Sequence, residues 1–381
     1  MAYEGEGREL NNIDFTPDFF RDEVREGFYV STMMKRYWAS QLKVLSIIAR
    51  ICDKYGLKWF ADYGTLLGTV RHGGYVPWDD DLDICMLRED YEKLFGVLEK
   101  ELPKDFKVLS LEKEPEYVEM IGRVVNSSVI DYGKEHLNEF YGCPYTVGID
   151  IFPLDGVYND PQKEEERRKR ANAVTDVVKK FESGPEGNNS IKKNRLLRKL
   201  EKMYRECPVE GAEKVALMNF YLSRGDHLYP KELFDQVVKL PFEETFMNVP
   251  ARYEEVLSIE YGDYMRVFKG GGMHDYPVYH DQEEILRQNL GENPFKYTFD
   301  MNQLLVSVSR YAKRMLEKAG NAAGGNVAGD LSGAGNRKVA VFLPCKATWW
   351  STMEPLWQKF CADPSMEVHV LPIFYYDCDH N

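Results

Sequence analysis

Helical and strand-like segments alternate between residues 33 and 152, and this alternation constrains the fold more than any other feature of the chain. Apolar residues recurring at three- and four-residue steps predict a helix over 33–55: Met34, Trp38, Leu42, Leu45, Ile48 and Cys52. Gly56 is placed to end this helix. Strands are expected over 58–63, 82–87, 106–111, 118–125 and 146–152, and helices over 64–70 and 89–102. This order predicts an α+β fold with a mixed β-sheet flanked by helices.

The rest of the chain divides by composition. Residues 161–224 are helical and highly charged, as expected for an insertion with solvated helix faces, and a loop over 183–190 interrupts them. We therefore assign residues 1–270 to the main domain and 271–319 to a helical closing segment. The Gly/Ala-rich stretch 320–336 predicts a flexible linker.

A short β-α-β unit is expected after the linker, with strands over 338–343 and 368–374 and a helix over 353–361. One such unit, within 337–381, cannot cover both faces of its own sheet. It therefore either docks elsewhere or begins a second domain that is cut at Asn381, and the sequence favours truncation.

The charge balance restricts the partners. The 381 residues carry 49 basic and 62 acidic side chains, a net charge of −13, with 44% hydrophobic residues that suffice for a large core. Such a surface repels nucleic acid, because that affinity rests largely on Lys and Arg neutralising phosphates. A nucleotide can still bind where divalent cations bridge carboxylates to its phosphates.

Several absences in the sequence point to a cytoplasmic protein. The seven cysteines are scattered without a C-x-x-C pair, so neither a zinc ribbon nor a disulfide framework is indicated. The first 30 residues contain acids and lack an apolar signal core. No run of 18 apolar residues exists, so no transmembrane segment is expected. Peripheral contact with the inner face of the membrane stays open.

The acidic cluster WDDDLD (78–83) is the first candidate site. Asp81 and Asp83 stand two apart at the start of an expected strand, so their side chains share one face, and Asp79 continues the same parity. Neighbouring carboxylates repel each other unless a cation lies between them, and Mg²⁺ (or Mn²⁺) prefers such ligands. A solvated acidic turn is the alternative. The flanking aromatic and apolar residues favour the metal site.

Gly64 and Thr65 form a second element, between a strand and a helix. A small residue there lets backbone amides approach a phosphate near the helix N-terminus, although an ordinary turn fits the same pattern. The expected substrate-binding set adds three side chains that could offset phosphate charge and one aromatic residue: Arg71, His72, Arg88 and Trp78. His72 could equally be a packed side chain.

Asp150 is the third element. It lies in the apolar strand VGIDIFPLD (147–155), where burying a carboxylate costs several kcal/mol unless a partner compensates it. A metal shared with Asp81 and Asp83 is one such partner, and a salt bridge to Arg123 is the alternative. Asp155, after Pro153, is expected to be a turn residue.

The run YGTLLGTVRHGGYVPWDDDLDICMLREDY (63–91) resembles the signature of the LicD family in the nucleotidyltransferase superfamily. That superfamily combines a strand, a Gly-Ser or Gly-Thr helix start, an Asp-x-Asp pair and a third acid on a neighbouring strand. In this chain Gly64–Thr65 resembles the helix start, Asp81 with Asp83 resembles the acidic pair, and Asp150 on its strand resembles the third acid. The stretch NVPARYEEVLSIEYGDYM (248–265) is similar to the family's closing segment, so the resemblance covers about residues 25–270.

The resemblance implies a nucleotidyltransferase-like catalytic domain over 1–270 and a metal-dependent phosphotransferase. Such an enzyme moves a phospho-alcohol group, such as phosphocholine, from a CDP-linked donor to a hydroxyl of a surface glycan, glycolipid, teichoic acid or glycoconjugate. Asp79, Asp81 and Asp83 would bind metal, and Asp150 would bind metal or accept the acceptor's proton. After Tyr264 the family usually shows an aromatic residue and a proline where this chain reads MRVFKGGGMHD, so the acceptor stays open.

Two rival functions fit the same residues. A nucleotidyltransferase would place the nucleoside monophosphate itself on a small acceptor and release pyrophosphate. A non-catalytic binding module would keep the fold only as a scaffold. The sequence does not identify the donor's alcohol, the acceptor or the oligomeric state.

Overall fold

A computed structural model describes residues 10, 13–185, 187–267, 276–295, 338–342, 356–360, 362–363 and 366–370. It divides into two compact units. The larger comprises Met1–Phe15 and Arg36–Asn293, and the second comprises Thr16–Lys35 and Pro294–Asn381.

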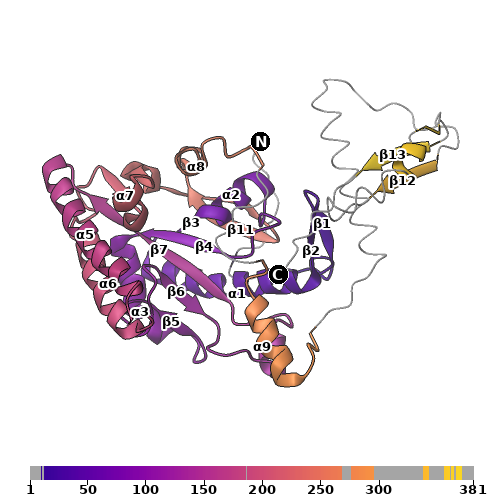
Figure 1. The fold of residues 1–381 in the computed structure, drawn as a ribbon, viewed down its shortest axis with the longest axis horizontal. Helices are drawn as coiled ribbons and strands as arrows, with labels where there is room; N and C mark the ends of the chain where they lie inside the picture. Colours follow the sequence, from indigo (N-terminus) through magenta and orange to yellow (C-terminus); the bar gives the residue numbers. More distant parts are fainter. Residues whose placement is uncertain are drawn as a thin grey trace. The chain divides into compact units, whose positions relative to one another are not determined.

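A mixed sheet organises the larger unit (Figure 1). Its strands follow the order β3-β4-β7-β6-β5, and β8 and β9 extend from β7. The strands are β3 (Phe60–Ala61), β4 (Asp83–Leu87), β5 (Lys107–Leu109), β6 (Gly122–Val125), β7 (Gly148–Val157), β8 (Lys214–Ala216) and β9 (Leu228–Pro230). Only β4 and β7 run parallel among these pairs, and the others are antiparallel. The expectation of a mixed sheet in an α+β fold is confirmed.

Helices surround this sheet, and α5 and α6 pack side by side at one end of it (Figure 1). The helices are α1 (Thr32–Tyr55), α2 (Tyr63–His72), α3 (Arg88–Glu101), α4 (Lys134–Glu139), α5 (Pro161–Glu182), α6 (Ser190–Tyr204), α7 (Met218–Arg224), η2 (Lys231–Phe234), α8 (Tyr253–Tyr261) and α9 (His280–Leu290). A hairpin of β10 (Val237–Phe242) and β11 (Thr245–Pro250) contacts β3 and α2. None of the helices that the structure describes combines the length and apolar character needed to cross a bilayer.

Helix α1 forms as its periodicity predicts. The six apolar residues of the expected stripe are all buried, and the Trp38 ring stacks on Tyr75 with centroids 4.4 Å apart. The helix ends at Gly56, whose φ of +65° is a left-handed conformation that glycine adopts without a side-chain clash. The four cysteines in the described part of the chain are free and buried.

Strand β7 is the longest strand described and positions the site. It pairs with β6 over its first half and with β8 over its last three residues, while β4 lies along its other edge. The expectation that the strand ends at Phe152 was wrong, since it continues through Pro153 to Val157. Pro153 is tolerated because it lies where β7 pairs with neither β6 nor β8.

The second unit contains a hairpin of β1 (Glu23–Arg25) and β2 (Phe28–Val30), and a parallel pair of β12 (Lys338–Phe342) and β13 (Met366–Val370). Residues 356–360 are helical, so the expected β-α-β order is present here. The linker assigned to 320–336 lies outside the described residues, as do 296–319 of the closing segment.

Candidate active site

Asp83 and Asp150 lie side by side on the parallel strands β4 and β7, where they are register partners. Neighbouring strands stand about 4.8 Å apart. Asp83 is buried, with 7% of its surface exposed, and Asp150 is partly buried. The sequence therefore brings two carboxylates that are far apart in the chain to one place on the sheet.

Asp79 and Asp81 precede the strand rather than lying on it, because β4 begins at Asp83. We expected the three acids to lie on one face of a strand, and this was wrong for Asp79 and Asp81. Both are partly exposed. Asp80 is fully buried, and its carboxylate accepts a hydrogen bond from the backbone N–H of Val278 at 2.6 Å.

Gly64 and Thr65 fix the acidic segment against the start of α2. A Cβ at position 64 would overlap the carboxylate of Asp79, so any residue other than glycine would require the Asp79 side chain to move. The buried hydroxyl of Thr65 accepts a hydrogen bond from the backbone N–H of Asp83 at 2.9 Å. Both residues contact the aspartate segment, and the expectation that they hold a diphosphate stays a prediction.

Arg123 donates hydrogen bonds to both carboxylate oxygens of Asp150. The two residues are register partners on β6 and β7, and Arg123 Nη2 donates to Asp150 Oδ2 at 2.7 Å while its Nε donates to Oδ1. The salt bridge that the sequence left open is therefore present. It holds the Asp150 carboxylate in one orientation beside Asp83.

The surroundings of Asp83 disfavour the charged form of its carboxyl. Burial raises the pKa of Asp83 well above its usual value, and the carboxylates of Asp81, Asp150, Asp79 and Asp62 raise it further. A cation near Asp83 would relieve this repulsion.

A divalent cation fits the chemistry of these donors, because hard carboxylate oxygens are the ligands that Mg²⁺ prefers. Among the residues described, however, no three His, Cys, Asp or Glu side chains are close enough together to hold a metal ion. The predicted ligand set is thus adjacent in the fold but not assembled into a coordination shell.

Asp62 and Glu260 form a second carboxyl pair that the sequence analysis missed. Asp62 is 2% exposed, and its backbone N–H donates to the carbonyl of Asp83 at 3.0 Å. Its carboxyl lies near that of Glu260, which accepts a hydrogen bond from the Tyr229 hydroxyl at 2.9 Å. Burial raises the pKa of Asp62 to about 6 and that of Glu260 well above its usual value. The argument applied to Asp150, an acid beside an apolar strand, would have found Asp62.

Arg71, His72 and Trp78 lie at the end of α2 and in the segment after it. Arg71 Nη1 donates to the backbone carbonyls of Tyr264 at 2.9 Å and Arg266 at 3.3 Å, and so ties α2 to the segment after α8. The rings of His72 and Trp78 meet edge to face, with centroids 6.2 Å apart. All three are partly exposed.

Arg88 is used differently from its predicted role in binding phosphate. It is buried, and its guanidinium donates to both oxygens of Asp155 at 2.6 and 2.9 Å and to Glu201 at 3.3 Å. Asp155 is itself 1% exposed within β7, so the expectation of a turn residue was wrong. Arg88 thus joins α3 to β7 through Asp155 and reaches α6 through Glu201.

Comparison with known proteins agrees with this geometry. The LicD/FKTN/FKRP nucleotidyltransferase domain family matches residues 56–141. The lipopolysaccharide cholinephosphotransferase LicD of Haemophilus influenzae is 24% identical over 243 residues, which cover 59% of this chain and 89% of that protein. An uncharacterized protein of Rickettsia typhi is 44% identical over 63 residues, 15% of this chain and 20% of its own length. Another, of Rickettsia prowazekii, is 43% identical over 71 residues, 17% and 27% of the two chains.

The mixed sheet, with paired aspartates at the start of β4 and a third on the adjacent strand, defines a nucleotidyltransferase-like fold. Within that class, the chain is similar to the LicD family over residues 56–141.

Proposed function

We propose that the protein is a metal-dependent phosphotransferase that moves a phospho-alcohol group from a CDP-linked donor to a hydroxyl of a surface glycan. Phosphocholine is the group proposed first, because the relative from Haemophilus influenzae is named a lipopolysaccharide cholinephosphotransferase. The observation that carries the proposal is the register pairing of the buried Asp83 with Asp150 on β4 and β7, with Asp79 and Asp81 immediately before β4.

The reaction is a displacement at phosphorus. The acceptor oxygen forms a bond to the β-phosphorus of the donor, the bond from that phosphorus to the bridging oxygen breaks, and CMP leaves. Such transfers need little covalent help from the protein, so positioning and charge stabilisation dominate. The acceptor's proton passes to a carboxylate or to solvent.

Asp81 and Asp83, with Asp79, would hold Mg²⁺, which when bound would neutralise charge on the transferring phosphate. Both oxygens of Asp150 accept hydrogen bonds from Arg123, which orient its carboxylate. We therefore propose that Asp150 acts through its negative charge and does not remove the proton of the acceptor. Thr65 fixes the backbone of Asp83 through its hydroxyl. Gly64 leaves the room that Asp79 requires.

Arg71, His72 and Trp78 are the side chains proposed to contact the donor. They lie on α2 or in the segment that joins it to the aspartates, and all keep part of their surface exposed. Arg88 is omitted from this set, because its charge is paired with Asp155 inside the protein.

Product analysis with the purified full chain tests the proposal. With CDP-choline, Mg²⁺ and lipopolysaccharide or lipoteichoic acid as acceptor, we expect CMP release and phosphocholine on the acceptor. Parallel reactions with CDP-glycerol and CDP-ribitol identify the alcohol. Pyrophosphate release from CTP, without CMP release from any of the three donors, would replace the proposal with nucleotidyl transfer.

Binding provides a second measurement that does not depend on the acceptor. A CDP-linked donor should raise the melting temperature only when Mg²⁺ or Mn²⁺ is present, because the aspartates repel the diphosphate without a cation. Equal stabilisation with and without the divalent cation would contradict metal-dependent donor binding.

A further inference from the structure

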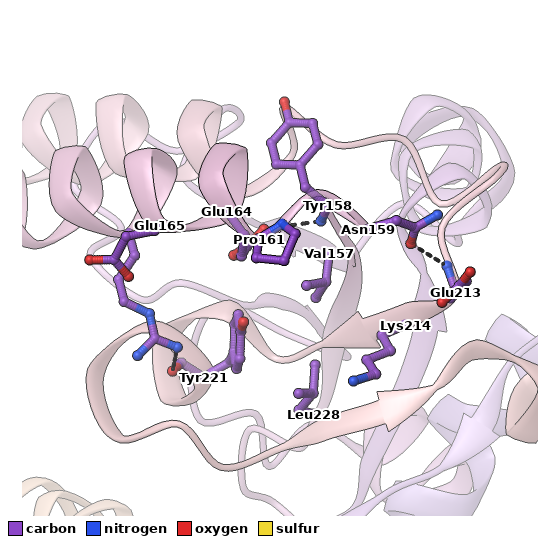
Figure 2. Close-up of a pocket in the computed structure, with 11 residues that line it drawn as sticks. Val157, Tyr158, Asn159, Pro161, Glu164, Glu165, Glu213, Lys214, Tyr221 and Leu228 are labelled. Carbon is purple, nitrogen blue, oxygen red and sulfur yellow. Dashed lines mark hydrogen bonds between the residues drawn. The ribbon is translucent and has the colours of Figure 1, made fainter.

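A cavity of about 300 Å³ lies away from the aspartates, at the far end of β7 (Figure 2). Its walls come from the end of β7, the first turns of α5, β8, α7 and β9. Val157, which lines it, is seven residues along the strand from Asp150, at most about 23 Å at ~3.3 Å per residue. This volume falls at the lower end of the range for small-molecule sites.

The cavity presents two cations. Arg168 lies over the Tyr221 ring, 4.9 Å from its centroid, and Lys214 projects from β8. Figure 2 shows the Lys214 side chain directed toward Leu228 and the interior of the cavity. Within the described residues, neither Arg168 nor Lys214 forms an ion pair with a carboxylate.

Two of the three acidic side chains at the cavity are already engaged. Glu164 receives hydrogen bonds from the buried guanidinium of Arg167 at 2.6 and 2.8 Å and from the backbone N–H of Tyr158. Glu165 pairs with Lys169 at 3.7 Å on the helix surface. Glu213 is exposed, so two cations face one unpaired acid.

The remaining residues that line the cavity are apolar, or their polar atoms already form hydrogen bonds within the protein. Val157 and Leu228 form an apolar wall, and both polar ends of Asn159 are taken by the backbone of Gly211 and Glu213. The ligand must therefore combine an anionic group for the two cations with a compact body that tolerates apolar contact.

We propose that this cavity is a binding site for a phosphorylated sugar, with the phosphate between Arg168 and Lys214 and the sugar against Val157 and Leu228. The site is separate from the aspartates, so it does not supply the transferred group. Its use as a contact for an anionic glycan acceptor rests on the proposed function, whereas the binding itself does not.

Calorimetric titration of the full chain with glucose 6-phosphate, without divalent cation, tests the site. We expect Arg168→Gln and Lys214→Gln each to weaken binding about tenfold, the loss of one charge-assisted hydrogen bond. Glu213→Gln should tighten binding, because it removes the unpaired acid. The matched control is Lys199→Gln, which removes one exposed positive charge from α6 and should leave affinity unchanged.

Glucose and inorganic phosphate separate the two halves of the ligand. Both should bind more weakly than glucose 6-phosphate, and Asp83→Asn should not change any of the three affinities. The proposal is overturned if the two cation variants bind glucose 6-phosphate like the parent protein, if glucose binds as tightly, or if Asp83→Asn abolishes binding. Inactivity toward CDP-linked donors, with this binding intact, would refute only the proposed function.

Discussion

Asp83 and Asp150 are register partners on the parallel strands β4 and β7, and Arg123 donates to both oxygens of Asp150 from the strand on its other side. One acid is thus charge-paired while its neighbour is buried among like charges. This asymmetry gives the two carboxylates different chemical roles although they stand side by side.

Asp81→Asn and Asp83→Asn should each lower turnover by at least about a hundredfold, because each removes charge that the transferring phosphate and its cation require. The melting temperature should stay the same or rise, since a buried repulsion is removed at Asp83. Steady-state CMP release and thermal unfolding measure the two effects. Full activity in the double variant would exclude these residues from the reaction.

Gly64→Ala should reduce activity with little change in stability, because the new methyl group displaces the Asp79 carboxylate, which ends a partly exposed side chain that can move. Gly96→Ala is the matched control. A Cβ at Gly96, exposed on α3, meets nothing within 4 Å, so this change should stabilise the helix by about 0.5–1 kcal/mol. Equal effects of the two substitutions on activity and urea unfolding would show that Gly64 does not position Asp79.

Arg88→Ala should destabilise the protein by about 3–5 kcal/mol, because it leaves Asp155 charged and buried without its partner. The comparison is Arg170→Ala, which breaks a surface pair of similar geometry with Glu206 and should cost no more than about 1 kcal/mol. Urea unfolding at neutral pH measures both. A small loss for Arg88→Ala would mean that the ion pair does not stabilise the contact between α3 and β7.

Asp62→Asn should make the protein more stable at pH 7. The folded-state pKa of Asp62 is about 6, above its ordinary 3.8, so the folded chain binds this proton more tightly than the unfolded chain. Stability contributed by this group therefore falls as the pH rises from about 4 to about 6, by up to ~3 kcal/mol. The variant should lose this slope.

Asp105→Asn, a change of an exposed acid in the loop before β5, is the control for that experiment. It should leave the dependence of the unfolding free energy on pH between 4 and 6 as in the parent protein. If both variants keep the parent protein's dependence of unfolding free energy on pH, the carboxyl that takes up a proton on folding is not that of Asp62.

Much of the fold follows from local pattern. The uninterrupted 3.6-residue period of α1 placed that helix within one residue of its observed start. The strand expected over 58–63 is only Phe60–Ala61, because Tyr63 takes a φ of +43° and begins α2. Side-chain pattern does not encode such a backbone change.

The site could be predicted in part. Acids next to apolar strands marked Asp83 and Asp150, and the register between their strands brings them together. The pairing of Asp62 with Glu260 depends on α8 packing against α2, a contact between segments that periodicity cannot relate. The Arg88–Asp155 pair could not be foreseen for the same reason, since burial of both partners decides its role.

The pairing of β4 with β7 also limits how this protein can change. Side chains alternate between the faces of a strand, so a slip of one residue would turn Asp150 away from Asp83 and Asp155 away from Arg88 together. A deletion between Asp150 and Asp155 should therefore cost catalysis and folding at once, whereas a one-residue insertion at the exposed Asn188, between α5 and α6, should leave both intact.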